Sequence, residues 1–289
     1  MVRTHRLSLA LPVAFALLWA SSYVTSRIGL EDISPLLFVA IRLVIAAPVM
    51  FLLCETILRE KVPAITQWTH LLVGGALVHG VTLCAAHVAL QTLNAAPLAL
   101  VHAFHPVLTA AIAVPLLKEQ FSAWQWLGMG IGLGGVAIAF PLSTTEGNVV
   151  GLVLLSLLGL TGGTLYLKRF APQVAPFPST AVQFVGGAVL SALAVVLFEQ
   201  PSANWTPSLV AMMSWNTVLV SIVGMTIYGL MLMRGEAGRA ASAFFIVPGT
   251  AALLGWVFLN QTLSPVGLAG LALATFGVWL VWRRPPEAR

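Results

Sequence analysis

Residues 147–167, GNVVGLVLLSLLGLTGGTLYL, decide the fold class of this chain. The segment carries no charged side chain, and from Leu152 to Leu160 it is a continuous apolar run interrupted only by small residues. About 20 apolar residues, each rising about 1.5 Å, form a helix that crosses the roughly 30 Å hydrocarbon core of a bilayer. The alternation typical of membrane β-strands is absent. The segment therefore predicts a transmembrane helix.

The composition of the whole chain agrees with this interpretation. Of its 289 residues, 59% are hydrophobic and 8% are charged, against roughly 45–50% and 25% in soluble domains. So few charged side chains cannot cover a water-soluble fold of this size, which excludes a soluble enzyme, and the same numbers exclude intrinsic disorder. The net charge of +5 comes from basic residues that stand singly or in pairs between apolar runs. This is typical of membrane-protein loops and argues against nucleic-acid binding.

Nine further segments resemble the first. Cutting the chain at charges, Pro/Gly/Asn clusters and polar runs predicts ten spans, with short connections that leave no room for an extramembrane domain. The spans are approximately 8–27, 34–53, 68–92, 95–116, 122–140, 147–167, 178–199, 207–233, 238–259 and 264–282. We therefore expect an all-α polytopic protein whose partner is the lipid bilayer.

The basic residues predict the orientation. With the N-terminus inside, every lysine and arginine except Arg27 and Arg42 falls on the inner side. Because cytoplasmic loops are rich in these residues, both termini are expected in the cytoplasm and the protein in the plasma membrane, the inner membrane of a bacterium. The first span is too long for a signal-peptide core and lacks a small-residue cleavage site, so it is expected to be retained.

The chain repeats itself at an offset of 142 residues. Without gaps, this offset aligns the fourth and fifth spans with the ninth and tenth, and it also aligns Arg27 with Arg169. The aligned identities are Ala95/Ala237, Ala99/Ala241, Pro106/Pro248, Ala110/Ala252, Ser122/Ser264, Gly128/Gly270, Gly135/Gly277 and Val136/Val278. Two units of five helices, 8–140 and 147–282, must lie in opposite orientations because five is odd. Such inverted repeats surround a central cavity in many secondary transporters, with the substrate near the midplane.

Two features of the repeat predict local structure. Pro106 and Pro248 each remove one helical hydrogen bond at equivalent places, which marks either a gate or hinge beside a binding site or a bend that shapes the bundle. The glycines of the fifth span, Gly128 to Gly135, predict a close helix–helix contact, more readily inside the bundle than between subunits.

At this point the chain resembles the drug/metabolite transporter superfamily, as a protein of two EamA-type repeats. In the first repeat the resemblance rests on Leu18-Trp19-Ala20-Ser21-Ser22-Tyr23, Pro35, Arg42, Ala95-Ala96-Pro97-Leu98-Ala99-Leu100, Pro106, Lys118-Glu119 and the glycine-rich fifth span. In the second it rests on Ala240-Ala241-Ser242, Pro248 and Gly267 to Gly277. Gln261 departs from the pattern, because the family often has glutamate there, whereas Glu119 keeps the equivalent position.

The resemblance implies ten helices, a central cavity and alternating-access export of small metabolites, commonly amino acids. Among subgroups the chain is most similar to the YddG-type exporters of aromatic and other amino acids. Another small metabolite or a drug of the same superfamily is the alternative cargo.

Polar residues inside the spans are the candidate substrate contacts, because they are unfavourable in lipid. His79 near the middle of the third span and His102 four residues before Pro106 are expected to face the cavity. The alternative for each histidine is a structural role, in which a neighbouring helix satisfies its polar atoms. We favour that alternative for His87.

Aromatic and hydroxyl side chains extend the candidate site. Trp19 and Tyr23 share one face of the first helix, with Ser22 adjacent. The repeat places Tyr166 in the corresponding stretch of the sixth span, and Phe244 precedes Pro248. Such a wall suits amphipathic substrates, although ordinary packing is the alternative.

Arg42 lies inside the second span. It either attracts a carboxylate or extends to the outer headgroups, and we expect the second, structural role. Gln183 is its expected counterpart, ahead of Asn216 and Tyr228.

No Asp or Glu lies well inside any predicted span. Ion-coupled carriers usually bury a carboxylate, so facilitated or exchange transport is expected, with His79 or His102 as the only proton carriers available. The motifs of intramembrane enzymes are absent from the sequence. A metal site on His79, His87, His102 and His105 lacks carboxylates and thiolates, so we expect no metal and no cofactor. The compact chain predicts a monomer.

Overall fold

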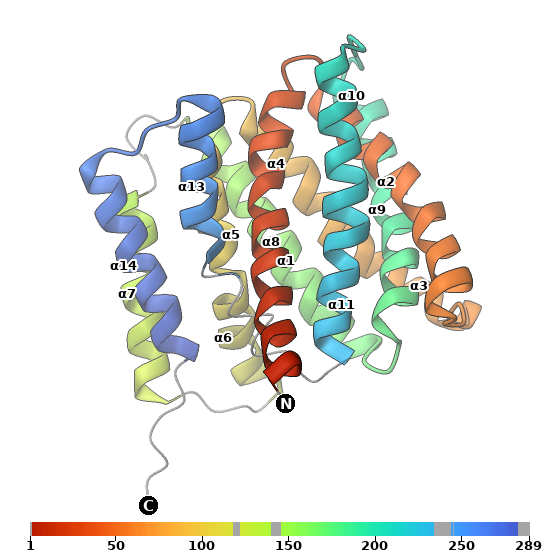
Figure 1. The fold of residues 1–289 in the computed structure, drawn as a ribbon, viewed down its shortest axis with the longest axis horizontal. Coiled ribbons are helices and arrows are strands. Elements are labelled where there is room, and N and C mark those ends of the chain that lie inside the picture. Colours follow the sequence, from red (N-terminus) through yellow and green to blue (C-terminus); the bar gives the residue numbers. More distant parts are fainter. Residues whose placement is uncertain (1, 118–121, 140–145, 234–243, 245, 283–289) are drawn as a thin grey trace, which may run out of the picture.

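The computed structural model describes residues 2–117, 122–139, 146–233, 244 and 246–282, and these residues form a bundle of helices (Figure 1). The helices are α1 Val2–Gly29, α2 Pro35–Leu53, α3 Ile65–Gly75, α4 Thr82–Leu90, α5 Ala95–Ala103, α6 His105–Leu117, α7 Ala123–Ala139, α8 Gly147–Phe170, α9 Pro176–Phe198, α10 Pro207–Ser214, α11 Met225–Met233, α13 Ile246–Leu259 and α14 Pro265–Trp282. Three π-helical segments, η1 Cys54–Leu58, η2 Ala76–Val81 and η3 Trp215–Gly224, continue the helices beside them. The described chain thus folds into ten rods, one for each predicted span.

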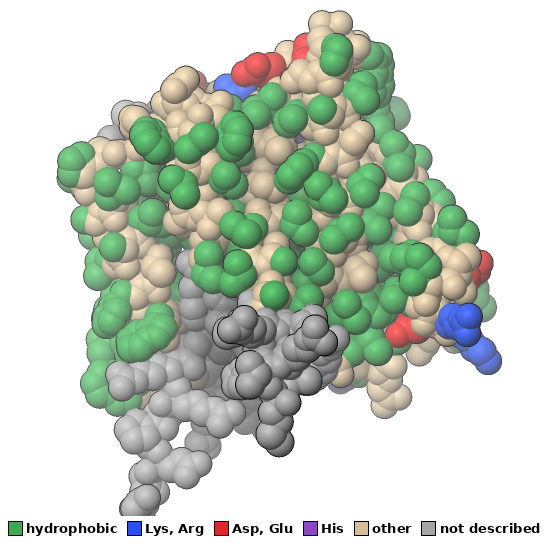
Figure 2. Space-filling model, in the orientation of Figure 1, with side chains coloured by type: hydrophobic (Ala, Val, Ile, Leu, Met, Phe, Trp, Pro, Cys, Tyr) green, Lys and Arg blue, Asp and Glu red, His purple; other side chains and the backbone are tan. Residues whose placement is uncertain are grey.

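The rods are long and apolar enough for a bilayer. Five of them in the described residues could each cross a membrane by length and composition, and four shorter apolar helices accompany them. Hydrophobic side chains cover the flank of the bundle in Figure 2, with charged side chains toward its two ends. Val196 and Phe198, for example, are each 80% exposed, which is unfavourable in water and favourable against lipid. The predicted all-α polytopic membrane fold is confirmed.

The fourth rod is interrupted at Pro106. Because proline has no N–H, the His102 carbonyl loses its usual helical donor. The α5 helix ends at Ala103 and α6 begins at His105. Between them the Phe104 N–H donates to the Val101 carbonyl at 3.1 Å, a tighter turn than an α-helix makes. Pro248 lies in the first turn of α13, and residues 234–243 and 245 ahead of it lie outside the described residues.

Contacts between the rods follow the repeat. The α2 helix packs on α9, and α7 packs on α14, so each of these pairs joins equivalent helices. Other contacts come in exchanged pairs: α1 with α13 corresponds to α8 with α5 and α6, and η2 with α9 corresponds to η3 with α2. These exchanged contacts are the pattern that two inverted repeats would produce.

The contact between α7 and α14 depends on glycine. A Cβ atom built on Gly135 would lie 2.7 Å from the Gly270 carbonyl oxygen, and one on Gly277 would lie 2.6 Å from the Gly128 carbonyl oxygen. A shift of 142 residues turns each of these contacts into the other. The α7–α14 contact, which we call the seam, therefore follows the internal repeat. The predicted close contact is therefore internal, where small residues let two backbones approach.

Two loops meet at one end of the bundle. We call the end where α1 begins the N-side and the opposite end the far side; α2 begins on the far side, and α9 ends there (Figure 1). There Glu199, just after α9, accepts hydrogen bonds from the Ser34 hydroxyl at 2.9 Å and from the Leu36 and Leu37 N–H groups at 2.9 and 2.8 Å. The carboxylate thereby caps the N-terminus of α2, where the helix dipole favours an anion.

A second set of bonds reinforces this contact. The Thr206 hydroxyl donates to the Asp32 carboxylate at 2.6 Å, and the Asn204 N–H donates to the Asp32 carbonyl at 2.7 Å. Gln261, two residues after α13, makes a similar cap, because its side-chain oxygen accepts a hydrogen bond from the N–H of Ala95 at the start of α5. We call the Glu199 and Asp32 contacts together the far-side clasp, which joins the first repeat to the second.

Candidate functional site

A cavity runs from the N-side into the middle of the bundle. Its larger part, the main cavity, has a volume of about 410 Å³ and extends from the α8–α9 turn at Lys168 and Pro172 to Trp19 and His79. A smaller part of about 60 Å³, the chamber, lies deeper and includes Arg42 among its walls. The two parts are adjacent, because five residues line both: Trp19, Val78, His79, Leu160 and Met225.

A hydrogen-bonded chain of three side chains lies on one side of the chamber, and two of its members, Tyr23 and His102, line it. The Tyr23 hydroxyl of α1 lies 3.0 Å from His102 Nδ1 of α5, and His102 Nε2 lies 2.8 Å from the Ser156 hydroxyl of α8. Ser156 donates its own proton to the Val153 carbonyl at 2.7 Å. It therefore accepts from Nε2–H, which leaves Nδ1 as the acceptor for Tyr23 in a neutral imidazole. All three groups are buried and satisfied.

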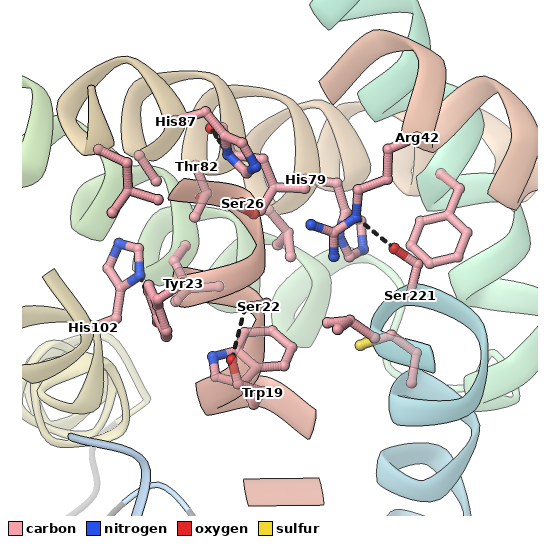
Figure 3. Close-up of a pocket in the computed structure, with 18 residues that line it drawn as sticks. Trp19, Ser22, Tyr23, Ser26, Arg42, His79, Thr82, His87, His102 and Ser221 are labelled. Carbon is pink, nitrogen blue, oxygen red and sulfur yellow. Dashed lines mark hydrogen bonds between the residues drawn. The ribbon is translucent and has the colours of Figure 1, made fainter. Parts of the chain in front are cut away.

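Arg42 forms the opposite wall of the chamber (Figure 3). Its side chain is 5% exposed and reaches across from α2 to η3, where Nε donates to the Ser221 hydroxyl at 2.8 Å and Nη1 to the Asn216 side-chain oxygen at 3.1 Å. The expectation that Arg42 extends to headgroups is wrong, because these bonds hold it inside the bundle. The expected counterpart Gln183 instead donates to Ser179 at 2.7 Å, and Asn216 takes its place.

Two further histidines bring unpartnered nitrogens to the chamber. His79, on the π-helical segment η2, is 6% exposed and packs edge-on against Phe184 with ring centres 4.8 Å apart. Its Nε2 has no hydrogen-bond partner, and neither has Nε2 of His87, whose Nδ1 lies 2.7 Å from the Leu83 carbonyl. Since that carbonyl can only accept, Nδ1 carries the proton, and Nε2 of the neutral His87 ring presents a lone pair.

Four aromatic rings wall the main cavity. Phe15 lies at the centre, with its ring 5.3 Å from Trp19, 5.3 Å from Tyr228 and 5.5 Å from Phe244. Phe15 and Trp19 belong to α1 and Tyr228 to α11, whereas Phe244 lies two residues before α13, so the wall joins both repeats. Tilted and edge-to-face contacts of this kind are favourable beyond simple burial, and the wall suits an apolar or aromatic substrate side chain.

Comparison with known proteins identifies the family. The profile of the EamA-like transporter family matches residues 7–140 and 148–283, that is, nearly the whole chain in two parts. The chain belongs to this family.

Relatives of this EamA-like transporter agree with the assignment. The uncharacterized transporter YvbV of Bacillus subtilis is 28% identical over 282 residues, which cover 94% of this chain and 90% of YvbV. The uncharacterized inner membrane transporter YedA of Escherichia coli K12 is 25% identical over 274 residues, covering 93% and 88%. A solved crystal structure of another protein matches with a TM-score of 0.68 at 19% identity, covering 94% of this chain and 96% of its own. That likeness shows the fold.

Most of the side chains singled out in the sequence meet in the cavity of this EamA-like transporter. His79, His102, Trp19, Ser22 and Tyr23 line the chamber, and Phe244 lines the main cavity. The Ser22 hydroxyl donates to the carbonyl of Trp19 at 2.7 Å, so it is satisfied within its own helix.

Tyr166 is the exception. Its hydroxyl lies 2.9 Å from Nδ1 of His70 on α3, and its ring contacts Phe170 with centres 4.7 Å apart. It is not among the residues that line either part of the cavity. The structure therefore does not bring Tyr166 together with Trp19 and Tyr23.

Four lining residues of this EamA-like transporter were passed over or placed differently from sequence. Arg42, His87, Phe15 and Tyr228 all line the cavity. A signal existed for Arg42 and His87, because polar side chains within a span are unfavourable unless they face the interior. Phe15 carried none, since aromatic residues are equally common on lipid-facing surfaces, and Tyr228 was considered only as a weaker counterpart of Arg42.

The histidines are dispersed among separate partners. His105 Nδ1 lies 3.1 Å from the Thr109 hydroxyl and 3.3 Å from the Thr161 hydroxyl, whereas His102 is held by Tyr23 and Ser156. In the described part of the chain no group of three or more His, Cys, Asp or Glu side chains is placed to hold a metal ion.

Proposed function

We propose that this EamA-like transporter exports amino acids, aromatic and others, and related small metabolites across the bacterial inner membrane. The observation that carries the proposal is the aromatic wall of Phe15, Trp19, Tyr228 and Phe244 around a cavity of about 410 Å³. Ligand sites of about 300–1,000 Å³, mostly apolar with a few polar groups, are typical for small metabolites. Amino acids with apolar side chains combine the two kinds of surface that this cavity offers.

The distribution of basic residues supports the direction. Arg59 and Lys61 lie between α2 and α3, and Lys168 and Arg169 lie in the last turn of α8, all at the N-side end, which the positive-inside rule assigns to the cytoplasm. With both termini cytoplasmic, the main cavity faces the cytoplasm. A substrate made in the cell then enters the cavity directly.

The symmetry of the contacts supports alternating access. The repeats 8–140 and 147–282 would exchange their arrangements between the two access states, with Pro106 and Pro248 as hinges of their rods. The single chain encloses the whole cavity, so the proposed unit is a monomer without a cofactor. No carboxylate lies well inside the predicted spans, which supports facilitated or exchange transport over ion coupling.

Exchange of labelled phenylalanine in proteoliposomes tests this function. Unlabelled aromatic and aliphatic amino acids should compete with the label, whereas sugars and quaternary ammonium drugs should not. Trp19→Ala should weaken competition by aromatic amino acids more than competition by alanine, because it removes part of the aromatic wall. Trp124→Ala is the matched control, since Trp124 is 56% exposed on the flank.

A second pair of variants tests the chamber. His79→Ala should reduce exchange, whereas His70→Ala should not, because His70 contacts Tyr166 and Phe170 outside the cavity. Competition by a drug or another metabolite in place of amino acids would establish the alternative cargo. Absence of amino-acid exchange by folded protein would refute the proposed substrate and leave the family and fold intact.

A further inference from the structure

Arg42 is a charged group with neutral partners. It donates to Ser221 and Asn216, and Asn216 also accepts from the Ser26 hydroxyl at 3.2 Å. The described part of the chain gives Arg42 no carboxylate partner, and the predicted spans contain no acidic residue well inside them. A buried charge is unfavourable without an opposite charge, so the chamber is electrostatically incomplete.

The bonds that Arg42 does make fix its orientation. With Nε directed at Ser221 and one Nη1–H directed at Asn216, the plane of the guanidinium is set by η3. The remaining N–H groups, including both on Nη2, have no acceptor in the described residues, and Arg42 lines the chamber. A guanidinium held in this way is ready to bind a planar carboxylate through two parallel hydrogen bonds.

We infer that Arg42 binds the carboxylate of the transported compound at the deep end of the cavity. The inference rests on the proposed function for the compound's identity and adds its chemical class: carboxylates are taken, whereas neutral amides and simple amines of the same shape are not. The chamber of about 60 Å³ holds the carboxylate end of the compound. Trp19 and Met225, which line both parts, lead its side chain into the main cavity.

The rest of the chamber matches the other half of an amino-acid headgroup. His87 lines the chamber on the same side as Arg42 in Figure 3, and its Nε2, which carries a lone pair, has no partner in the described residues. An ammonium group donates hydrogen bonds and accepts none. The chamber therefore offers hydrogen-bond donors at Arg42 and an acceptor at His87, the two kinds of group that a zwitterion needs.

Four compounds with one aromatic ring test the inference by competition against labelled phenylalanine. Phenylalanine and 3-phenylpropanoate carry the carboxylate, whereas phenylalaninamide and 2-phenylethylamine lack it. In the wild-type protein the two carboxylates should compete at least tenfold better than the other two. Equal competition by phenylalanine and its amide would overturn the inference while leaving phenylalanine transport established.

Variants assign the preference to Arg42. Arg42→Gln should abolish the tenfold difference between phenylalanine and its amide, and Arg42→Lys should retain part of it, because the charge stays but the planar fork is lost. Arg27→Gln, at the far-side end of α1 and outside the cavity lining, should leave it unchanged. A carboxylate preference that survives in folded Arg42→Gln protein would overturn the inference. If Arg42→Gln does not fold, the inference is still tested by comparing the carboxylate preference of Arg42→Lys with that of the wild type.

Thermal stabilisation separates this inference from the proposed function. If phenylalanine is not exchanged, pairs of aliphatic carboxylates and their amides, with inorganic phosphate, are tested as stabilisers of the wild type and of Arg42→Lys. Stabilisation by carboxylates over amides, reduced in the variant, would support Arg42 as a carboxylate site although the amino-acid assignment had failed. The inference would be overturned if phosphate alone stabilised the protein, or if none of the carboxylates did.

Discussion

The Tyr23 hydroxyl lies 3.0 Å from His102 Nδ1, and this bond joins α1 to the interrupted fourth rod at the level of the chamber. His102 continues to Ser156 on α8 at 2.8 Å, so three helices from both repeats share one line of hydrogen bonds. Each group has its partner, which distinguishes this wall from the opposite one, where Arg42 and His87 present unsatisfied atoms. The chamber therefore has one side whose polar groups are all hydrogen-bonded, and one side with unpartnered groups, where we propose that the substrate binds.

The Tyr23→Phe variant should destabilise the protein. It leaves His102 Nδ1 buried without a donor, which costs about 1–3 kcal/mol of unfolding free energy. Thermal unfolding of the purified protein measures the loss. Tyr166→Phe is the matched control, because its partner His70 is only partly buried and regains water. Equal losses of stability in the two variants would contradict the hydrogen-bonded arrangement of Tyr23, neutral His102 and Ser156.

Substitution of glycine by alanine should lower stability at the seam between α7 and α14 but not at exposed positions of the same helices. Gly270→Ala places a Cβ 2.5 Å from the Ala139 backbone nitrogen and should cost about 1–3 kcal/mol, because the two backbones must move apart. Gly130→Ala has open space around its Cβ and should be neutral or stabilising by up to about 1 kcal/mol, since alanine is the better helix former. Thermal unfolding compares them. A harmless Gly270→Ala would show that the seam is not tight.

The Glu199→Gln variant should loosen the far-side clasp. Hydrogen bonds to a charged group contribute about 1.5–3 kcal/mol each, so partial loss should favour opening on that side by at least tenfold. The readout is the rate at which a charged thiol reagent modifies Cys84 in a Cys54→Ser background. Cys84 and Glu199 line the same groove on the far side, and the chain has two cysteines.

Glu146→Gln serves as the control for the clasp. Glu146 is exposed at the start of α8 on the far side, and its side chain makes no capping bond. Its substitution should leave the Cys84 rate unchanged. If both variants raise the rate alike, the effect comes from lost surface charge and not from the clasp.

Transport should run down the substrate gradient. With no carboxylate well inside the predicted spans, a pH gradient imposed on proteoliposomes should not drive uphill accumulation of phenylalanine. Accumulation that disappears in a His79→Ala, His102→Ala variant would identify a histidine as the proton carrier. Accumulation that persists in this variant would refute facilitated transport altogether.

The ten rods could be read from hydropathy because a span in lipid must satisfy its backbone internally. The break in the fourth rod followed from Pro106, and the seam from the glycines of α7. These features depend on local sequence alone. The choice of neighbours, by contrast, depends on how each rod is rotated about its axis, which hydropathy leaves open when all faces are apolar.

Tyr166 illustrates the limit. At the offset of 142, the equivalent of Tyr23 is Leu165, and Tyr166 corresponds to Val24. One residue rotates a side chain by about 100° around a helix, so Tyr166 turns toward His70. Arg42 was misplaced for a related reason: its depth was read correctly, but its direction depends on Ser221 and Asn216 of a distant rod.

The far-side clasp makes the two halves of the transport cycle unequal. At the position 142 residues before Glu199 the first repeat has Ile57, which is 72% exposed and cannot cap a helix. Two identical inverted repeats would give the two access states equal energy, whereas a clasp that the described residues form on the far side only favours the state in which that side is shut. Without substrate, the protein would then mainly adopt the state in which the cavity is open toward the N-side. The speed of a cycle would be set by how often the clasp releases, whereas the net direction of flow would still follow the concentration gradient.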